Sequence, residues 1–172
     1  MQSADNQQES PVVSREFVAG LLVGEGYFGL AICKNPTLKL RGGFQIVPRF
    51  ALHMKDECTM NLVIDAFREW ELKIYIEPQN KVNGKRISAA AGKNVRPIIA
   101  EFLPWLTGSK KEAALLVQEF IDLRRSHPKR PYSDEEARIV NDLRRVNGGN
   151  FSNKNLLESS TTIRRARGEK PS

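Results

Sequence analysis

The pattern of hydrophobic and polar residues changes its period along the chain, and each period predicts one kind of element. Ser14 can cap a helix that runs through an uninterrupted apolar segment and ends at the glycines of residues 24–26. Alternating β-forming residues predict strands at 27–34 and 44–55. Pro48 predicts a bulge or a change of face in the second strand, because proline cannot donate to a sheet ladder.

The second half of the chain repeats this order. Apolar residues at helical spacing predict a helix at 56–70. Two short strands follow at 73–78 and 85–91, and the Asn83–Gly84 pair between them favours a tight hairpin turn. Three further helices are predicted, at 95–103, 110–125 and 135–146. Asn94 can cap the first. Capping boxes of Ser109 with Glu112 and of Ser133 with Glu136 precede the second and third. Together these elements predict an α+β fold.

Length and charge narrow the class of protein. The 172 residues suit one domain, which we expect at 15–150. Residues 1–14 are too poor in apolar side chains to order themselves and are expected to form a flexible arm, while 151–172 form a basic tail. The formal net charge of +7 should draw the chain to polyanions, of which nucleic acid is the commonest.

Cysteine use and the absence of targeting patterns indicate a location. Cys33 and Cys58 make neither a metal-ligand cluster nor a disulfide framework, and free thiols fit a reducing interior. The N-terminus lacks the basic start and apolar stretch of a signal peptide. No apolar run approaches the roughly 20 residues that a membrane-spanning helix needs. We therefore expect a soluble, intracellular protein with no membrane partner.

The segment FVAGLLVGEGYF at 17–28 carries the most informative pattern. Its predicted helix is apolar on more than one stripe, so it must be covered on more than one side. Gly20 and Gly24 lie four residues apart on one face, a spacing that lets another backbone come close. Since the chain holds one such segment, the expected partner is the same segment of a second copy, in a two-fold contact. The predicted contact residues are Phe17, Gly20, Leu21 and Gly24.

Glu25 stands at the C-terminal end of this helix, where the helix dipole disfavours negative charge. In the simplest interpretation, Gly-Glu-Gly is a turn and Glu25 points into water. A local rule that fails without local compensation also tends to mark function. The carboxylate and the free carbonyls of the helix end, presented by two subunits, would form hard oxygen ligands suited to Mg²⁺.

The residues VAGLLVGEG, 18–26, resemble the signature of the LAGLIDADG homing endonucleases. They match it at four positions, Ala19, Gly20, Leu21 and Gly26. Glu25 stands in place of the family's last acid, while Val23 stands where the signature has its first. The expected order of elements over 15–150 is similar to the family's αββαββα core, and the family's chains with one motif are homodimers.

This resemblance implies a saddle-shaped antiparallel sheet that binds double-stranded DNA, with the motif helices of two subunits at its centre. It implies that Glu25 and the backbone carbonyl of Gly24 hold Mg²⁺ or a similar ion, and that each subunit hydrolyses one strand. Lys110 and Lys111 are the candidates for a lysine that neutralises the phosphate during reaction. The implied function is an intron- or intein-associated endonuclease that makes a staggered cut in a long pseudo-palindromic target, with no small-molecule substrate.

Contacts to DNA would fall to the outward faces of the strands and to their loops. Arginine and lysine can bind guanine or phosphate, and glutamine can pair with adenine. The candidates are Lys34, Lys39, Arg41, Gln45, Arg49, Lys73, Tyr75, Lys81, Lys85, Arg86 and Ser88.

Two other functions remain open from the sequence. LAGLIDADG folds also serve non-cleaving nucleic-acid binders, both RNA maturases and DNA-binding regulators. Such proteins need not keep the motif's acid, so Glu25 favours the endonuclease. A basic structural protein whose glycine-rich helix only pairs subunits is the other alternative.

Overall fold

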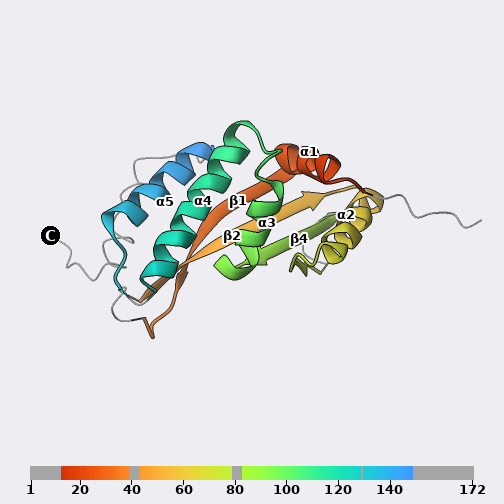
Figure 1. Ribbon diagram of the computed structural model, residues 1–172. Coiled ribbons are helices and arrows are strands. Elements are labelled where there is room, and N and C mark those ends of the chain that lie inside the picture. The colour runs from red at the N-terminus through yellow and green to blue at the C-terminus, as the bar shows by residue number, and fades with distance from the viewer. Residues whose placement is uncertain (1–12, 39–42, 79–82, 129, 149–172) are drawn as a thin grey trace, which may run out of the picture.

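An antiparallel sheet is covered on one face by helices, with α4 and α5 packed side by side (Figure 1). The computed structural model describes residues 13–38, 43–78, 83–128 and 130–148. The elements are α1 (Arg15–Glu25), β1 (Gly26–Lys34), β2 (Phe44–Met54), α2 (Glu57–Glu69), β3 (Tyr75–Ile76), β4 (Lys85–Ala90), α3 (Gly92–Phe102), α4 (Gly108–Ser126) and α5 (Asp134–Val146). This order confirms the predicted α+β class and αββαββα core, followed by C-terminal helices.

The ends of the chain bear on two earlier predictions. The predicted tail and all but the last two residues of the predicted arm lie outside the described residues. None of the described helices is both long enough and apolar enough to cross a membrane.

The sheet has the strand order β1-β2-β4-β3, and all neighbours are antiparallel. β1 and β2 pair without interruption from Gly26 opposite Leu52 to Lys34 opposite Phe44. Even-numbered residues of β2, such as Phe50, point toward the helices, because side chains alternate along a strand. The odd-numbered residues of β2 and their partners on neighbouring strands form the opposite side, here called the outer face.

The bulge or change of face predicted at Pro48 is wrong. Pro48 pairs with Leu30 in an unbroken register, and its carbonyl accepts a hydrogen bond from the Ala91 N–H at 3.1 Å. In an antiparallel strand the nitrogen and carbonyl of one residue point to the same side. The Pro48 nitrogen therefore points away from β1, toward the place where β2–β4 pairing has stopped at Arg49 and Ala90. Proline fits here because no ladder bond to β1 requires its N–H.

A row of buried aromatic rings joins the sheet to two helices. The ring centroids of Phe28 and Phe50 lie 5.4 Å apart, those of Phe50 and Phe67 5.9 Å, and those of Phe67 and Phe102 5.5 Å. All four side chains are fully buried. The row runs from β1 and β2 into α2 and α3, so that the two repeats of the core share one apolar interior.

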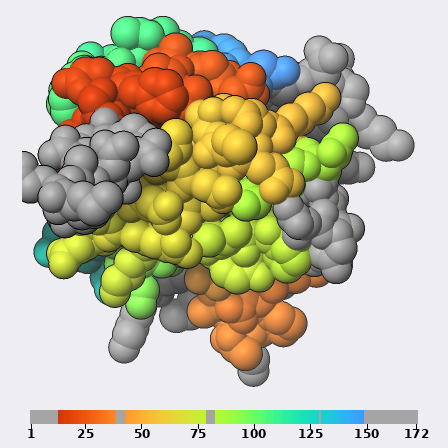
Figure 2. Space-filling model, turned by 90° about the vertical axis from the view of Figure 1, so that its right-hand side faces the viewer, coloured from red at the N-terminus to blue at the C-terminus, as the bar shows by residue number. Residues whose placement is uncertain are grey.

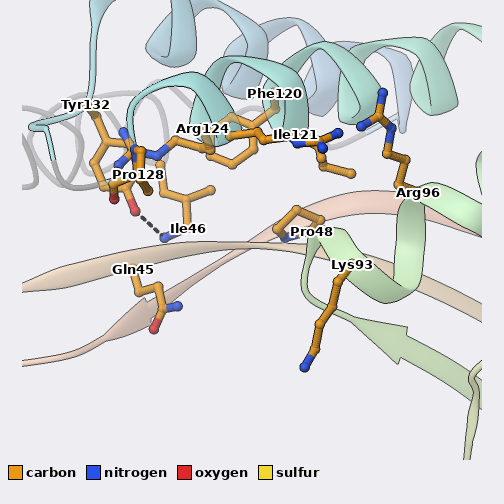
Figure 3. A pocket seen from close by; sticks show the side chains of 12 residues that line it. Gln45, Ile46, Pro48, Lys93, Arg96, Phe120, Ile121, Arg124, Pro128 and Tyr132 are labelled. Carbon is orange, nitrogen blue, oxygen red and sulfur yellow. Dashed lines mark hydrogen bonds between the residues drawn. The ribbon is translucent and has the colours of Figure 1, made fainter.

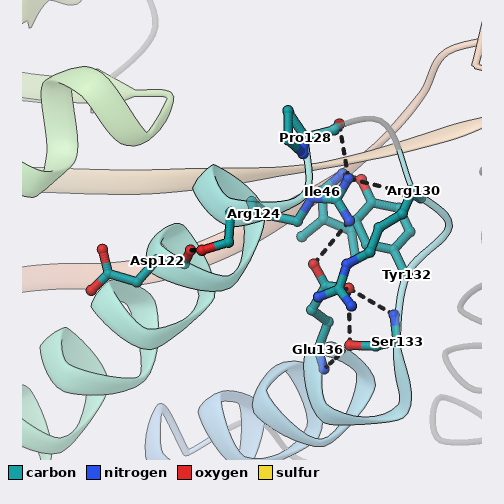
Figure 4. Close-up of polar contacts among 9 residues, drawn as sticks. Ile46, Asp122, Arg124, Pro128, Arg130, Tyr132, Ser133 and Glu136 are labelled. Atoms are coloured by element: carbon teal, nitrogen blue, oxygen red, sulfur yellow. Dashed lines mark hydrogen bonds and ion pairs between the residues drawn. The ribbon is translucent and has the colours of Figure 1, made fainter.

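Arg124 on α4 organises the connection to α5 (Figure 4). Its guanidinium donates to the Glu136 carboxylate at 3.0 Å and to the backbone carbonyls of Pro128 and Arg130 at 3.0 and 3.1 Å. Glu136 is fully buried and also accepts the Ser133 N–H at 2.7 Å, which confirms the predicted capping box of α5. A buried carboxylate needs such partners, because an unpaired one would carry a large desolvation cost.

Two predicted helix starts are wrong. α3 begins at Gly92, before the predicted cap Asn94, whose side chain donates to the Ala90 carbonyl at 2.9 Å instead. α4 begins at Gly108, so Ser109 lies inside its first turn and forms no capping box. The start of α3 packs closely against α4, because a Cβ on Gly92 would lie 3.1 Å from the Ile121 side chain. Glycine therefore suits this position.

Candidate functional site

α1 ends at Glu25, and the chain passes directly into β1. Ser14 caps the helix as predicted, since its hydroxyl oxygen accepts the Phe17 N–H at 3.2 Å. At the other end the Gly26 N–H donates to the Leu22 carbonyl, and a Cβ on Gly26 would lie 2.5 Å from that oxygen. Glycine at this junction lets the helix turn into the strand, which leaves Glu25 exposed at the surface.

α1 is covered by the rest of the described chain on one side. Its buried residues are Val18, Ala19 and Leu22. The opposite face lies at the surface, where α1 is drawn in red in Figure 2, and carries Phe17, which is 48% exposed, with Gly20 and Gly24. A Cβ on either glycine would meet no atom within 4 Å, so packing within the described chain does not require glycine there.

Lys110 contacts the end of α1 from the first turn of α4. Its side-chain nitrogen donates a hydrogen bond to the carbonyl of Gly26, the residue after Glu25. Lys111 is exposed, and its backbone N–H donates to the Thr107 carbonyl at 3.2 Å. Of the two predicted lysines, Lys110 is the one whose side chain reaches the motif.

The chemistry at the end of α1 fits a hard divalent cation. Glu25 offers an exposed carboxylate, and the last carbonyls of a helix, including that of Gly24, have no partner within the helix. Among the residues that the structure describes, no three His, Cys, Asp or Glu side chains gather at one place. One described chain thus supplies one carboxylate to such a site, and further ligands would have to come from a second copy, DNA or water.

The outer face brings several predicted DNA contacts into adjacent rows. Tyr27, Ala51, Ser88 and Tyr75 are aligned across all four strands. In the next row Arg49 lies between Gly29 and Ala90 and is exposed. Nearer the β1–β2 loop, Gln45 lies opposite Cys33. On the other side of the Tyr27 row, Arg86 lies opposite His53 and pairs with Glu77 at 3.5 Å.

Other predicted contacts lie elsewhere. Lys85 pairs in the sheet with Met54, and its ammonium bonds Asn61 at 2.6 Å and lies 3.7 Å from Glu57, both on α2. Its side chain thus leaves the sheet on the helix side. Lys34 is exposed at the end of β1, and Lys73 is exposed just before β3. Three predicted contacts lie outside the described residues, namely Lys39, Arg41 and Lys81.

Arg144, near the end of α5, is a candidate that sequence reasoning missed. It lines a hollow of about 270 Å³ together with Tyr27, two residues after Glu25. Burial lowers the pKa of Arg144 below its ordinary value, and the Tyr27 side chain opposes that shift. The sequence offered no signal for Arg144 except its residue type, because the approach of α5 to β1 is a tertiary contact. The Asn147 side chain, which donates to the Phe28 carbonyl at 3.0 Å, is another example of that approach.

Comparison by sequence finds no relative: no protein-family model and no curated protein matches the chain. Comparison by structure does. The homing endonuclease I-CvuI in complex with its target superposes with a TM-score of 0.65 at 13% identity, over 91% of this chain and 96% of that one. The archaeal intron-encoded homing endonuclease I-Vdi141I, complexed with DNA, gives 0.66 at 15% identity, over 87% and 93%.

A third structural neighbour is named as a LAGLIDADG protein. The I-LtrWI LAGLIDADG homing endonuclease bound to target DNA gives a TM-score of 0.59 at 19% identity, over 73% of this chain and 41% of its own. The chain has the LAGLIDADG homing-endonuclease fold. In this LAGLIDADG fold, the segment VAGLLVGEG that suggested the resemblance lies in α1 and its junction with β1, next to the sheet.

Proposed function

We propose that the protein is a homodimeric, site-specific DNA endonuclease that uses divalent metal ions, with Mg²⁺ as the expected ion. The proposal includes an intron- or intein-associated homing role and a staggered cut in a long pseudo-palindromic target. The observation that carries it is the end of α1, where Glu25 is exposed, the carbonyl of the following Gly26 binds the Lys110 side chain, and a glycine face of the helix lies uncovered by the described chain. The solved DNA complexes that share the fold support double-stranded DNA as the substrate.

The residues at the end of α1 have distinct roles in this proposal. The Glu25 carboxylate and the Gly24 carbonyl hold the metal ion, which when bound supplies an activated water and stabilises the leaving 3′ oxygen. The Lys110 ammonium, which is bonded to the carbonyl of Gly26, offsets negative charge that develops on the phosphate. Lys111 is the second candidate for that role.

Cutting both DNA strands requires two copies of the α1 end that carries Glu25, one from each subunit. The contact that we propose uses Phe17, Gly20, Leu21 and Gly24 of each subunit, an exposed or half-buried face without side-chain bulk at its two glycines. A two-fold contact along this face would bring two copies of Glu25 close to one axis, one for each strand.

The outer face of the sheet is the proposed surface for the duplex. Gln45, Arg49, Tyr75, Arg86 and Ser88 face it, and Lys73 lies at its edge. Side chains of these types can contact base edges or phosphates. Lys34, Lys85 and the candidates outside the described residues remain predictions.

A cleavage assay tests the proposal. The protein and Mg²⁺ are incubated with duplex DNA from the intron-lacking allele of its host gene, and the cut ends are mapped. We expect a staggered double-strand cut. Glu25→Gln should keep DNA binding and lower the cleavage rate by roughly 10²-fold or more, because it removes the charge at the metal site.

Glu16→Gln is the matched control, since Glu16 is an exposed acid in the first turn of the same helix. It should leave cleavage unchanged. Intact DNA with the wild-type protein, under conditions where it binds the site, would contradict the endonuclease and leave a non-cleaving DNA-binding protein. A protein that prefers RNA to duplex DNA would favour the maturase alternative.

A further inference from the structure

Surface hollows adjoin one another at the corner where β4 passes into α3. A hollow of about 310 Å³ on the outer face is lined by Arg49, Lys73 and Asn94, among others. A second hollow, of about 200 Å³, shares Lys73 and Asn94 and adds Lys93. A third, of about 480 Å³, begins at Lys93 and continues toward α4 (Figure 3). We call Arg49, Lys73 and Lys93 the corner cations.

The corner cations belong to the described basic side chains that form no ion pair. None of the three forms an ion pair with another described residue, and all three are exposed. By contrast, Arg96, one turn further along α3, pairs with Asp122 at 3.2 Å. One carboxylate, that of Glu71, also lines the second hollow. Three cations against one acid leave the corner with a net positive charge for a ligand.

Lys93 points toward the side of the molecule that carries the outer face. In Figure 3 its side chain extends past β2 in the same direction as Gln45, away from Phe120 on α4. Lys93 also lies in the first turn of α3, which has no acidic residue and no side-chain cap. The positive end of the helix dipole therefore adds to the charge of its side chain.

The arrangement favours a row of anions over a single one. The corner cations lie along adjoining hollows. Arg49 and Lys73 line the hollow on the outer face, and Lys73 and Lys93 line the next one. A single small anion would require cations that converge on one point, whereas a sugar-phosphate backbone presents charges in a line.

We propose that the corner binds the phosphate backbone of the same duplex that lies on the outer face, and that Lys93 contacts a phosphate beyond the end of β4, where the chain passes into α3. This inference rests on the proposed function, because it takes duplex DNA as the ligand. Contacts to phosphates set the position of a protein on DNA and carry no base sequence. Lys93 should therefore contribute affinity without contributing specificity.

The salt dependence of binding tests the proposal. The full-length protein, its Lys93→Ala variant and an Arg68→Ala control are titrated with the target duplex and with an unrelated duplex over a series of salt concentrations. Each lost phosphate contact lowers the slope of log K against log salt by about 0.9, so a dimer that loses two should change by about 1.8. We expect this change for Lys93→Ala, equally on both duplexes.

Arg68→Ala removes the same charge from α2, where Arg68 pairs with Asp65, and should leave the slope unchanged. Lys93 is exposed, so its variant should unfold at the same temperature as the wild type. If the wild type binds and cuts DNA but Lys93→Ala shows an unchanged slope, the corner contact alone is overturned. A loss confined to the target duplex would also overturn it, since that would indicate base reading. A wild-type protein that binds no duplex would overturn the proposed function as well.

Discussion

The side-chain nitrogen of Lys110 donates a hydrogen bond to the carbonyl of Gly26, which lies 84 residues earlier in the chain. This bond places a cation at the C-terminal end of α1, where the helix dipole is negative and where Glu25 adds a carboxylate. A cation from α4 thus lies at the same helix end as the acid that breaks a local rule in the sequence. Local sequence patterns could not reveal this contact.

Replacing Lys110 should separate its contribution from that of Lys111. Lys110→Met keeps the apolar stem and removes the ammonium, so we expect a cleavage rate lower by roughly 10²-fold, with DNA still bound. The lost charged hydrogen bond should also lower the free energy of unfolding by about 1–2 kcal/mol. Lys111→Met should change neither quantity much. Rates from cleavage assays and urea unfolding curves check both, and a slower Lys111→Met would reverse the assignment.

Gly20 should matter to the dimer and not to the folded chain. Gly20 lies on the exposed face of α1, and a Cβ there would meet no described atom within 4 Å, so a Gly20→Leu subunit should keep its thermal stability. The same side chain should prevent two copies of α1 from approaching closely. We expect the wild type to sediment as a dimer at micromolar concentration and Gly20→Leu as a monomer, with Gly20→Ala between them. A wild type that is monomeric with and without DNA would contradict the predicted interface.

The Tyr132 hydroxyl should stabilise the part of β2 that has no β4 partner. It accepts the N–H of Ile46 at 2.7 Å, and both residues are buried. Tyr132→Phe leaves that N–H without a partner, which should lower the free energy of unfolding by about 1–3 kcal/mol. Denaturant unfolding measures the loss, and hydrogen exchange at the Ile46 amide should become faster. Unchanged exchange at Ile46 would show that the hydroxyl is not its protecting group.

Asp56 should make stability depend on pH in acid. It caps α2, and the hydrogen bond from the Thr59 side chain holds the pKa of its carboxyl below the ordinary value of 3.8. A pKa that is lower in the folded state contributes stability above 3.8, and this contribution is lost as the pH falls through the folded value. Asp56→Asn keeps a cap without a titrating group.

We therefore expect the wild type to lose more stability than Asp56→Asn between about pH 5 and about pH 2. Thermal unfolding midpoints of both proteins across this range provide the measurement. Parallel curves would show that other carboxylates account for the acid sensitivity.

Some sequence signals whose partners lie within one turn of a helix were reliable, and others were not. Ser14, the Ser133–Glu136 capping box and the order of helices and strands were all predicted correctly. The starts of α3 and α4 were not, and neither was the regular pairing of Pro48. Pro48 bonds the chain just after β4, and Gly92 packs against α4; both contacts involve residues distant in the sequence, which local patterns do not encode.

The same division holds for the candidate site. The sequence by itself determined the apolar helix, its glycine face and the position of Glu25 at its end, because helical periodicity and capping are local properties. Only the tertiary structure decided that Lys110 and not Lys111 contacts that end, that Lys85 leaves the sheet toward α2, and that Lys93 joins Arg49 and Lys73 at one corner. The direction of a long basic side chain depends on elements packed around it, and those elements come from distant parts of the chain.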